Sequence, residues 1–289
     1  MRLLVAVAHY YKAGDGRHGS LGRDPAPRLR ALRQVILQLH RLFGEPAATL
    51  NHLQRRVDGV ADGGGPLDIR LCVQEPHHLL GELADLAPGF TAVPSSPEDP
   101  RLLGFCCHTV LAEAWQQALA AGNPYDYVAY LEDDIVITDA DFFLKLRQFN
   151  RAFGDGYLLM PNRLETAEHL DQLRRFYIDG DYNPAASAAW RQAGGQVLAL
   201  EHLGELVRFE QPPNLHAGCF FLNGAQATTY FASEHSRTID TSFHGPLESA
   251  ATLGMLKTFQ LMKPAPANGR FLTVQHAGRN FMGLVPALR

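Results

Sequence analysis

The chain has 289 residues, of which 46% are hydrophobic and 19% charged, so it is long enough to bury a substantial core. This composition excludes a disordered chain, a collagen and a coiled coil. The first 60 residues carry ten Lys and Arg against four Asp and Glu, whereas the rest carries sixteen against twenty-six. An acidic main body argues against a general nucleic-acid binder.

The cysteines and the apolar runs indicate where the protein resides. Cys72, Cys106, Cys107 and Cys219 show no paired spacing, which is typical of a reducing cytosol and of cysteines that serve as core residues. The apolar run at residues 3–8 is too short for a secretory signal. No later run approaches the ~20 apolar residues that a membrane-spanning helix needs. We therefore expect a cytoplasmic protein without a transmembrane segment, at most peripheral at a membrane.

Strands and helices are expected to alternate through the first half of the chain. Apolar runs bounded by turn residues predict strands at 3–8, 68–74, 89–93 and 127–137. Apolar residues at helical spacing predict helices at 27–44 and 104–121. The outer face of the first helix carries Arg28, Arg30, Arg33 and Arg41, and it is predicted to be solvated, with contact to a membrane surface as the alternative.

The second half begins with a helix after Thr138 or Asp139 and a strand at 157–160. The hydrophobic pattern is less regular in the next part of the chain. It predicts a polar helical stretch at 165–176, then a loop, then an Ala/Gly-rich part that could be an acceptor-side insertion or lid. Regular structure returns with a strand at 216–223, helices ending near 233 and spanning 246–259, and a strand at 271–274. This alternation predicts one α/β domain with a mostly parallel sheet and helices on both faces, whose ligands bind beyond the carboxyl ends of the strands.

Three consecutive carboxylates end the strand at 127–137. Glu132, Asp133 and Asp134 lie side by side, which is unfavourable unless a cation or tight hydrogen bonds compensate their charge. Side chains alternate along a strand, so Glu132 and Asp134 are expected to point one way and Asp133 the other. Hard oxygen ligands favour Mg²⁺ or Mn²⁺, which keep positions open for water and diphosphate oxygens. The alternative is that these acids cap the next helix, although a cap uses one side chain.

In this context the segment Tyr130-Leu-Glu-Asp-Asp134 resembles the type-A (GT-A) glycosyltransferases, whose sugar-nucleotide donor is held by a D-x-D or E-D-D motif. The likeness extends in outline from the first strand to the last. It implies a GT-A-like fold, with a nucleotide-binding half at 1–137 and an acceptor-side half at 138–289. It also implies that Asp134 ligates the metal and that Glu132 and Asp133 contact ribose or the metal's waters.

The same resemblance suggests roles for residues near both ends of the chain. His9, Tyr10 and Lys12 follow the first strand and would face the nucleotide. His276 follows the last strand and could complete the metal shell, in which case its imidazole would favour Mn²⁺ over Mg²⁺. Arg279 could meet the diphosphate. Ordinary surface roles for His276 and Arg279 stay open.

Glu248 is the candidate base for an inverting sugar transfer. Such a reaction needs a carboxylate that takes the proton from the acceptor hydroxyl. Glu248 opens a predicted helix after His244-Gly245-Pro246, where inverting members of the family carry their base, although Ser249 replaces the acid that usually follows. The competing interpretation is a first-turn Glu that interacts with the helix dipole.

The sequence thus predicts a Mn²⁺- or Mg²⁺-dependent glycosyltransferase. Its partners would be a nucleotide-diphosphate sugar and a hydroxyl-bearing acceptor, which could be a saccharide, a lipid-linked molecule or a small molecule. Hydrolysis of a phosphoester and nucleotidyl transfer can use the same cation. Nucleotidyl transfer is weakened because no Gly-rich phosphate loop with a basic residue follows the first strand. A nucleotide-binding module without catalysis is the remaining alternative.

Overall fold

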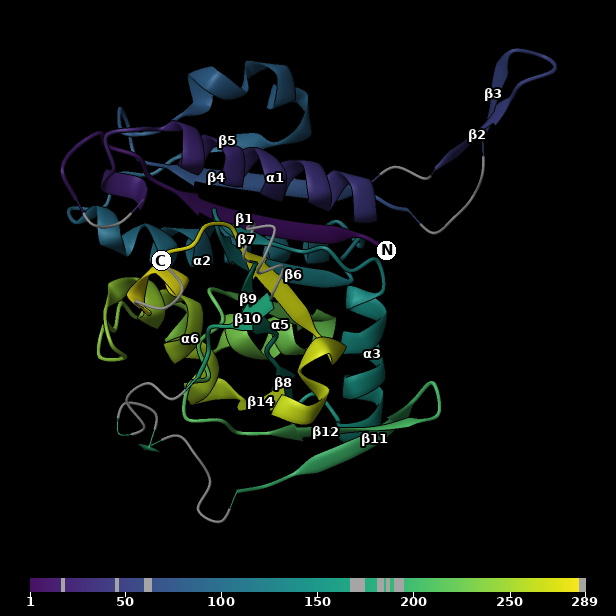
Figure 1. The fold of residues 1–289 in the computed structure, drawn as a ribbon, viewed down its shortest axis with the longest axis vertical. Helices are drawn as coiled ribbons and strands as arrows, with labels where there is room; N and C mark the ends of the chain where they lie inside the picture. The colour runs from purple at the N-terminus through teal and green to yellow at the C-terminus, as the bar shows by residue number, and fades with distance from the viewer. Residues whose placement is uncertain are drawn as a thin grey trace.

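The computed structural model describes residues 1–16, 19–44, 47–59, 64–166, 175–180, 185, 188–189 and 195–285. At its centre lies a five-stranded sheet in the order β13-β6-β1-β4-β5 (Figure 1). Its strands are β1 (Leu3–His9), β4 (Leu67–Val73), β5 (Thr91–Pro94), β6 (Tyr127–Glu132) and β13 (Cys219–Asn223). Four run parallel, and β13 is antiparallel to β6. The near-continuous apolar run of β1 fits its central position, where both faces are buried.

Helices cover both faces of this sheet. On one face lie α1 (Ala26–Phe43) and α3 (Phe142–Phe153), where the Phe143 ring packs 4.8 Å from both Phe43 and Tyr127. On the other face lie α2 (Leu103–Ala120), α5 (Gly224–Ala232) and α6 (Pro246–Thr258). There His108 packs 5.8 Å from Tyr130, whose side chain points opposite to that of Tyr127. The predicted fold class, a mostly parallel α/β sheet with helices on both faces, is confirmed.

Shorter strands extend the core. One four-stranded sheet has the order β10-β9-β15-β7, from β7 (Ile135–Val136), β9 (Asn162–Thr166), β10 (Arg175–Tyr177) and β15 (Thr273–His276). Another has the order β11-β12-β14-β8, from β8 (Tyr157–Leu159), β11 (Leu198–His202), β12 (Glu205–Glu210) and β14 (Gln260–Pro264). A separate hairpin joins β2 (Ala48–Asn51) and β3 (Arg56–Gly59). The short 3₁₀ helices are η1 (Gly19–Leu21), η2 (Leu80–Gly89), η3 (Pro100–Leu102), η4 (Glu234–Ser236), η5 (Pro266–Phe271) and η6 (Met282–Leu284).

Two local predictions were wrong. The polar helical stretch expected at 165–176 contains the ends of β9 and β10, because β9 pairs with β15 and turns Glu165 into the core. The strand expected at 127–137 breaks at Asp133 and Asp134, which form a turn between β6 and β7. The Ala/Gly-rich part expected as an insertion lies mostly outside the described residues. Within the described ranges, no helix combines the length and the apolar character needed to cross a membrane.

His108 is a buried polar residue in the core and provides a test of the packing. Its Nε2 donates a hydrogen bond to the carbonyl of Ala250 (2.9 Å), and the Tyr230 hydroxyl lies 3.0 Å from Nδ1. Burial lowers the pKa of His108 to about 4, so the folded chain keeps the ring neutral while the unfolded chain protonates it near pH 6.5. The stability that neutral His108 contributes is therefore complete above pH 6.5 and is lost as the pH falls towards 4.

We expect this loss to reach about 3 kcal/mol in the free energy of unfolding. Urea unfolding of the wild type and of His108→Gln at pH 7 and pH 4 measures it. Other titrating groups are shared by the two proteins, so the difference between them isolates His108. Equal pH dependence in the two proteins would contradict the assignment.

Candidate active site

The acid turn at 132–134 lies where β6 ends, at the carboxyl edge of the parallel strands. The backbone N–H of Glu132 donates to the carbonyl of Gly218 (2.9 Å), which joins the turn to the segment that leads into β13. The N–H of Ala277 donates to the carbonyl of Asp134 (2.7 Å), and His276 pairs with Ile135. These backbone bonds place His276, the last residue of β15, next to the acid turn.

Asp133 points inward and is fully buried. His9 Nδ1 lies 2.5 Å from its Oδ2, and the backbone N–H of Leu79 donates to His9 Nε2 (3.1 Å). Because Nε2 accepts that bond, the proton of the neutral ring is on Nδ1 and is donated to Asp133. Both His9 and Asp133 are completely inaccessible to solvent. Their placement makes them supports of the acid turn, in contrast to the expected contacts with a nucleotide.

The cation beside the acid turn is Arg28, from the first turn of α1. Its guanidinium pairs with Asp133 and donates to Asp134 Oδ2 from Nη1 (2.6 Å). Burial alone would lower the pKa of Arg28, but the two carboxylates outweigh it and hold this pKa above its usual value. The prediction of a solvated position for Arg28 was therefore wrong. The signal was present in the sequence, because Arg28 precedes the buried Leu32 and Val35 by four and seven residues, on the same face of the helix.

His276 is held in one orientation beside Asp134. Its Nδ1 lies 2.9 Å from Oε1 of the buried Glu165, and its Nε2 lies 3.6 Å from Asp134 Oδ2. Glu165 also accepts hydrogen bonds from the N–H groups of Phe281 (3.1 Å) and Met282 (2.8 Å), so its position is fixed. Burial acts to lower the pKa of His276, but Glu165 and Asp134 together raise it. Glu165 is not among the residues predicted from sequence, because residue 165 was expected in a polar helix.

The donor atoms here fit a divalent cation that is shared with a ligand. Asp134 Oδ1 is buried and has no hydrogen-bond partner, whereas Oδ2 of the same carboxylate accepts from Arg28 and lies 3.6 Å from His276 Nε2. Two ligands about 2.1 Å from one cation lie about 3 Å apart, close to this separation. A metal-ligating imidazole is commonly oriented by a carboxylate on its other nitrogen, as Glu165 orients His276. The described residues contain no cluster of three or more such ligands, so the other ligands would be diphosphate and water oxygens.

Glu132 faces His216 across the end of β6. Its Oε1 lies 4.0 Å from His216 Nε2, and His216 Nδ1 lies 2.9 Å from the Thr252 hydroxyl on α6. Burial, reinforced by Asp134, raises the pKa of Glu132 to about 8, and burial lowers the pKa of His216 well below its usual value. Both side chains are therefore neutral near pH 7, and protonated Glu132 can donate a hydrogen bond to a ligand. Gly218 has φ +64°, and a Cβ there would lie 2.9 Å from Glu132 Oε2.

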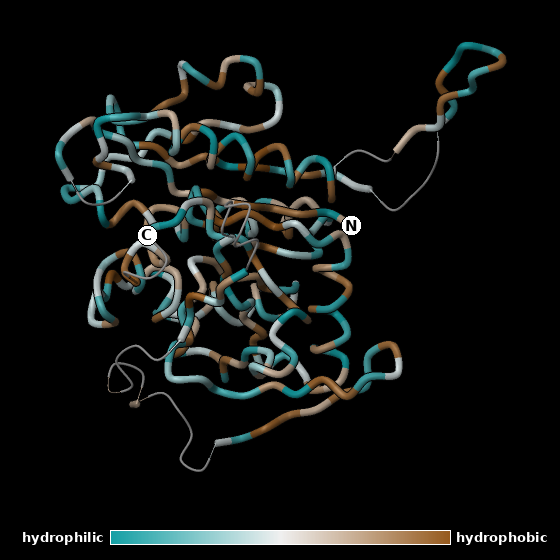
Figure 2. The backbone as a smooth tube through the Cα atoms, in the orientation of Figure 1, coloured by the Kyte–Doolittle hydropathy of each residue, from teal (hydrophilic) through white to brown (hydrophobic). Residues whose placement is uncertain are grey.

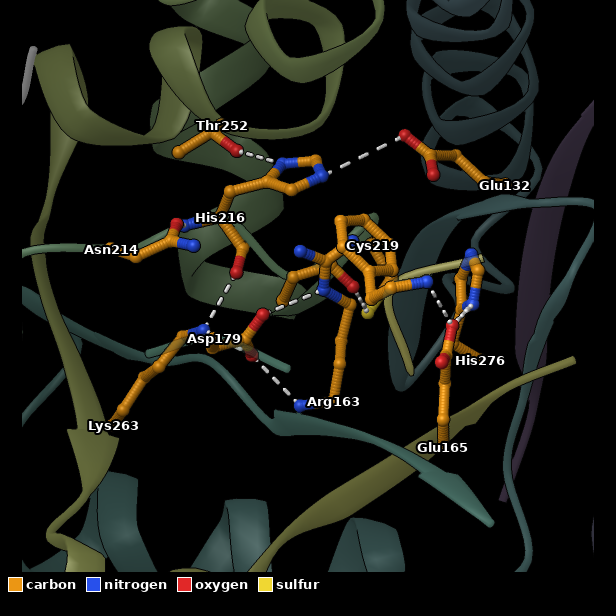
Figure 3. A network of polar contacts seen from close by, with 12 residues as sticks. Glu132, Arg163, Glu165, Asp179, Asn214, His216, Cys219, Thr252, Lys263 and His276 are labelled. Atoms are coloured by element: carbon orange, nitrogen blue, oxygen red, sulfur yellow. Dashed lines mark hydrogen bonds and ion pairs between the residues drawn. The ribbon is translucent and has the colours of Figure 1, made fainter. Parts of the chain in front are cut away.

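A buried charged network supports this side of the site (Figure 3). Asp179 accepts hydrogen bonds from Arg163 Nε and Lys263 Nζ, both at 2.8 Å. Lys263 also donates to the carbonyl of His216 (2.6 Å), so the network fixes the backbone that leads to Gly218. Asp179 falls in the loop expected after residue 176, and no role was predicted for Arg163 or Lys263, which lie far apart in the chain.

Glu248 lies in the first turn of α6, one turn before Thr252 and thus on the same helix face. Thr252 contacts His216, and the negative charge of Glu248 contributes to the raised pKa of Glu132. The structure therefore brings Glu248 to the acid turn.

The remaining candidates lie at the rim of the site. Tyr10 is half-buried and packs edge-on against His77 with ring centroids 5.8 Å apart. Lys12 is exposed, and Arg279 is half-buried in the turn after His276.

Comparisons with known proteins assign neither a family nor an activity to this chain. No protein-family model matches the chain, and no curated protein matches it. Solved structures with a similar arrangement include mannose-1-phosphate geranyltransferase from Thermus thermophilus (14% identity, 91% of this chain and 74% of that chain, TM-score 0.40). They also include 4-diphosphocytidyl-2C-methyl-D-erythritol synthase (8%, 92% and 91%, TM-score 0.36) and CMP:2-keto-3-deoxy-manno-octonic acid synthetase complexed with CTP (13%, 92% and 92%, TM-score 0.36). At these identities and TM-scores the likeness assigns no activity, so the function follows from the site itself.

Proposed function

We propose that the chain is a metal-assisted transferase that moves a sugar from a nucleotide-diphosphate donor to an acceptor hydroxyl. One observation carries this proposal: Asp134, whose Oδ1 is buried without a hydrogen-bond partner, has its Oδ2 3.6 Å from Nε2 of His276, and Glu165 fixes the ring of that histidine. This pair stands at the carboxyl edge of a parallel sheet, where ligands of α/β proteins bind. When bound, Mn²⁺ or Mg²⁺ at Asp134 and His276 would neutralise the departing diphosphate.

The donor would lie across the acid turn, in the half formed by residues 1–137. Glu132, whose pKa burial and Asp134 raise to about 8, can donate a hydrogen bond to a sugar or ribose oxygen when it is protonated. Arg28 holds both Asp133 and Asp134 in position, and His9 holds Asp133, through ion pairs and hydrogen bonds. Tyr10, Lys12 and Arg279 at the rim remain the proposed contacts to the nucleotide and the diphosphate.

The acceptor would enter from the half formed by residues 138–289, which contributes Glu248. As a carboxylate near the acid turn, Glu248 can take the proton from the acceptor hydroxyl as that oxygen attacks the sugar. This step inverts the configuration of the sugar. A retaining reaction would not require Glu248 as a base.

Nucleotidyl transfer is the second candidate. It is favoured by Arg28, a basic residue that follows the first strand and reaches the acid turn. The segment at 12–24 between that strand and α1 contains Gly14, Gly16, Gly19 and Gly22, so the argument against nucleotidyl transfer from a missing Gly-rich loop is weak. The released product distinguishes the candidates, because sugar transfer yields a nucleoside diphosphate and nucleotidyl transfer yields pyrophosphate. A binding module would release neither.

Asp134→Asn tests the proposal directly. A panel of sugar nucleotides is titrated into the wild type by calorimetry with and without Mn²⁺. We expect a donor that binds with Mn²⁺, and a more than tenfold weaker affinity in Asp134→Asn because a neutral amide is a poorer ligand for a hard cation. Asp141→Asn, at an exposed position, is the matched control. Equal affinities of wild type and Asp134→Asn would reject the metal assignment.

A further inference from the structure

The turn that leads into α6 has an unusual backbone at His244. In the part of the chain that the structure describes, three residues other than glycine have a positive φ, namely Arg55, Leu203 and His244. Arg55 and Leu203 lie in the turns of the β2–β3 and β11–β12 hairpins, where a positive φ is common. His244, with φ +58°, belongs to no hairpin. The N–H of Gly245 donates to the carbonyl of Phe243 (2.6 Å), which closes a rare and strained three-residue turn around His244.

Buried contacts impose this turn, whereas the side chain at its centre is exposed. Phe243 is completely buried. The buried Ser249 hydroxyl accepts a hydrogen bond from the N–H of Phe243 (3.0 Å) and donates one to its carbonyl (2.9 Å). The exposed ring of His244 packs edge-on against Phe243, with centroids 4.6 Å apart. Strain that the surrounding structure imposes on an exposed polar residue points to a role in function.

The same turn lies next to the candidate base. A Cβ on Gly245 would lie 3.0 Å from Oε2 of Glu248, so this carboxylate folds back over the turn. Gly245 follows His244 directly and leaves room for the carboxylate. The imidazole of His244 and the carboxylate of Glu248 thus both belong to the start of α6, about one helical turn apart in the chain.

Electrostatic effects connect these two side chains to the acid turn. Burial, followed by positive charges that include His244, lowers the pKa of His216. Burial and Asp134 are the main causes of the raised pKa of Glu132, and Glu248 adds to them. His216 Nε2 and Glu132 Oε1 lie 4.0 Å apart (Figure 3). His216, Glu132, Glu248 and His244 therefore gather near the end of β6, and His244 is the exposed one of the four.

We propose that His244 binds the acceptor, through a hydroxyl adjacent to the one from which Glu248 takes the proton. A neutral imidazole has one nitrogen that donates and one that accepts, which matches a hydroxyl group. A saccharide carries neighbouring hydroxyls, whereas a simple alcohol has none to offer His244. The acceptor is therefore a saccharide. This inference rests on the proposed sugar transfer and specifies its acceptor.

Glycine at position 244 separates strain from function. Glycine adopts a positive φ without a steric penalty, so His244→Gly should raise the midpoint of thermal unfolding by about 2 °C. Leu203→Gly is the matched control, because Leu203 also has a positive φ and is 90% exposed. Figure 1 and Figure 2 show the tip of the β11–β12 hairpin on the other side of the molecule from α6. A lower midpoint for His244→Gly alone would show that the ring serves packing on Phe243, and it would overturn the proposal.

Kinetics with saccharide acceptors test the contact itself. A sugar nucleotide that binds with Mn²⁺ is held at saturation, and the concentrations of free mono- and disaccharides are varied. His244→Gly and His244→Ala should both raise the acceptor KM about tenfold, the effect of one lost hydrogen bond, while Leu203→Gly should match the wild type. Ala retains the Cβ and hence the strained turn, so an equal effect of both variants assigns the loss to the imidazole. Donor affinity in calorimetry should not change.

Deoxy analogues of the preferred saccharide identify the hydroxyl that His244 contacts. One analogue should raise KM about tenfold in the wild type but not in His244→Ala, because the variant has already lost that contact. An unchanged KM in His244→Ala would overturn the proposal, as would analogues that affect both proteins equally or aliphatic alcohols that serve as well as saccharides. Sugar transfer itself would stand in each of these cases. A wild type that releases no nucleoside diphosphate from any sugar nucleotide would instead reject the proposed function, and this inference with it.

Discussion

Glu248→Gln is expected to lower the turnover of sugar transfer by about 10²- to 10⁴-fold, the usual contribution of a general base. The amide keeps the shape of the side chain but cannot accept the proton of the acceptor hydroxyl. Donor affinity should remain close to that of the wild type, because the donor would contact Asp134 and Glu132 rather than Glu248. Initial rates at saturating donor measure turnover, and calorimetry measures donor affinity.

The matched control is Glu113→Gln on α2, where the side chain is exposed. It removes the same charge from another helix and should leave the turnover unchanged. A rate for Glu248→Gln within twofold of the control would show that the reaction does not use this carboxylate as its base. Lost donor affinity with unchanged turnover would instead assign Glu248 to the donor.

The central sheet was predictable because local sequence determines it. The apolar runs of β1 and β6 can only be buried on both faces, and the amphipathic helices between them leave few arrangements other than a parallel sheet. The position of the acid turn follows from the same pattern, because its first residue, Glu132, is also the last residue of β6. Sequence alone thus predicted the place of the candidate site at the carboxyl edge.

The support of the site was not predictable in the same way. Glu165, Asp179 and Lys263 act through contacts with residues far away in the chain, and no local pattern marks them. Arg28 was accessible to sequence reasoning, since it shares a helix face with Leu32. It was overlooked because a charged residue is normally assigned to the solvated face.

Arg28 leads to the second prediction with a large effect: Arg28→Met should lower the free energy of unfolding by about 3–5 kcal/mol. Met preserves most of the apolar packing of the side chain but removes the charge that balances Asp133 and Asp134. Asp133 is fully buried, and His9 alone would be left to compensate it. Removing one partner of a buried ion pair is costly because the other charge remains out of water.

Urea unfolding measures this loss, and Arg30→Met is the control. Arg30 is exposed on the same helix, so its replacement should cost no more than about 0.5 kcal/mol.

Binding of Mn²⁺ gives a second measurement. If Asp134 is a metal ligand, the ion should stabilise Arg28→Met more than the wild type, because it supplies the missing positive charge and binds the folded state alone. A loss no larger than in the Arg30 control would mean that the acid turn does not need Arg28. If Mn²⁺ stabilises both proteins equally, the ion does not compensate for the charge that Arg28→Met removes.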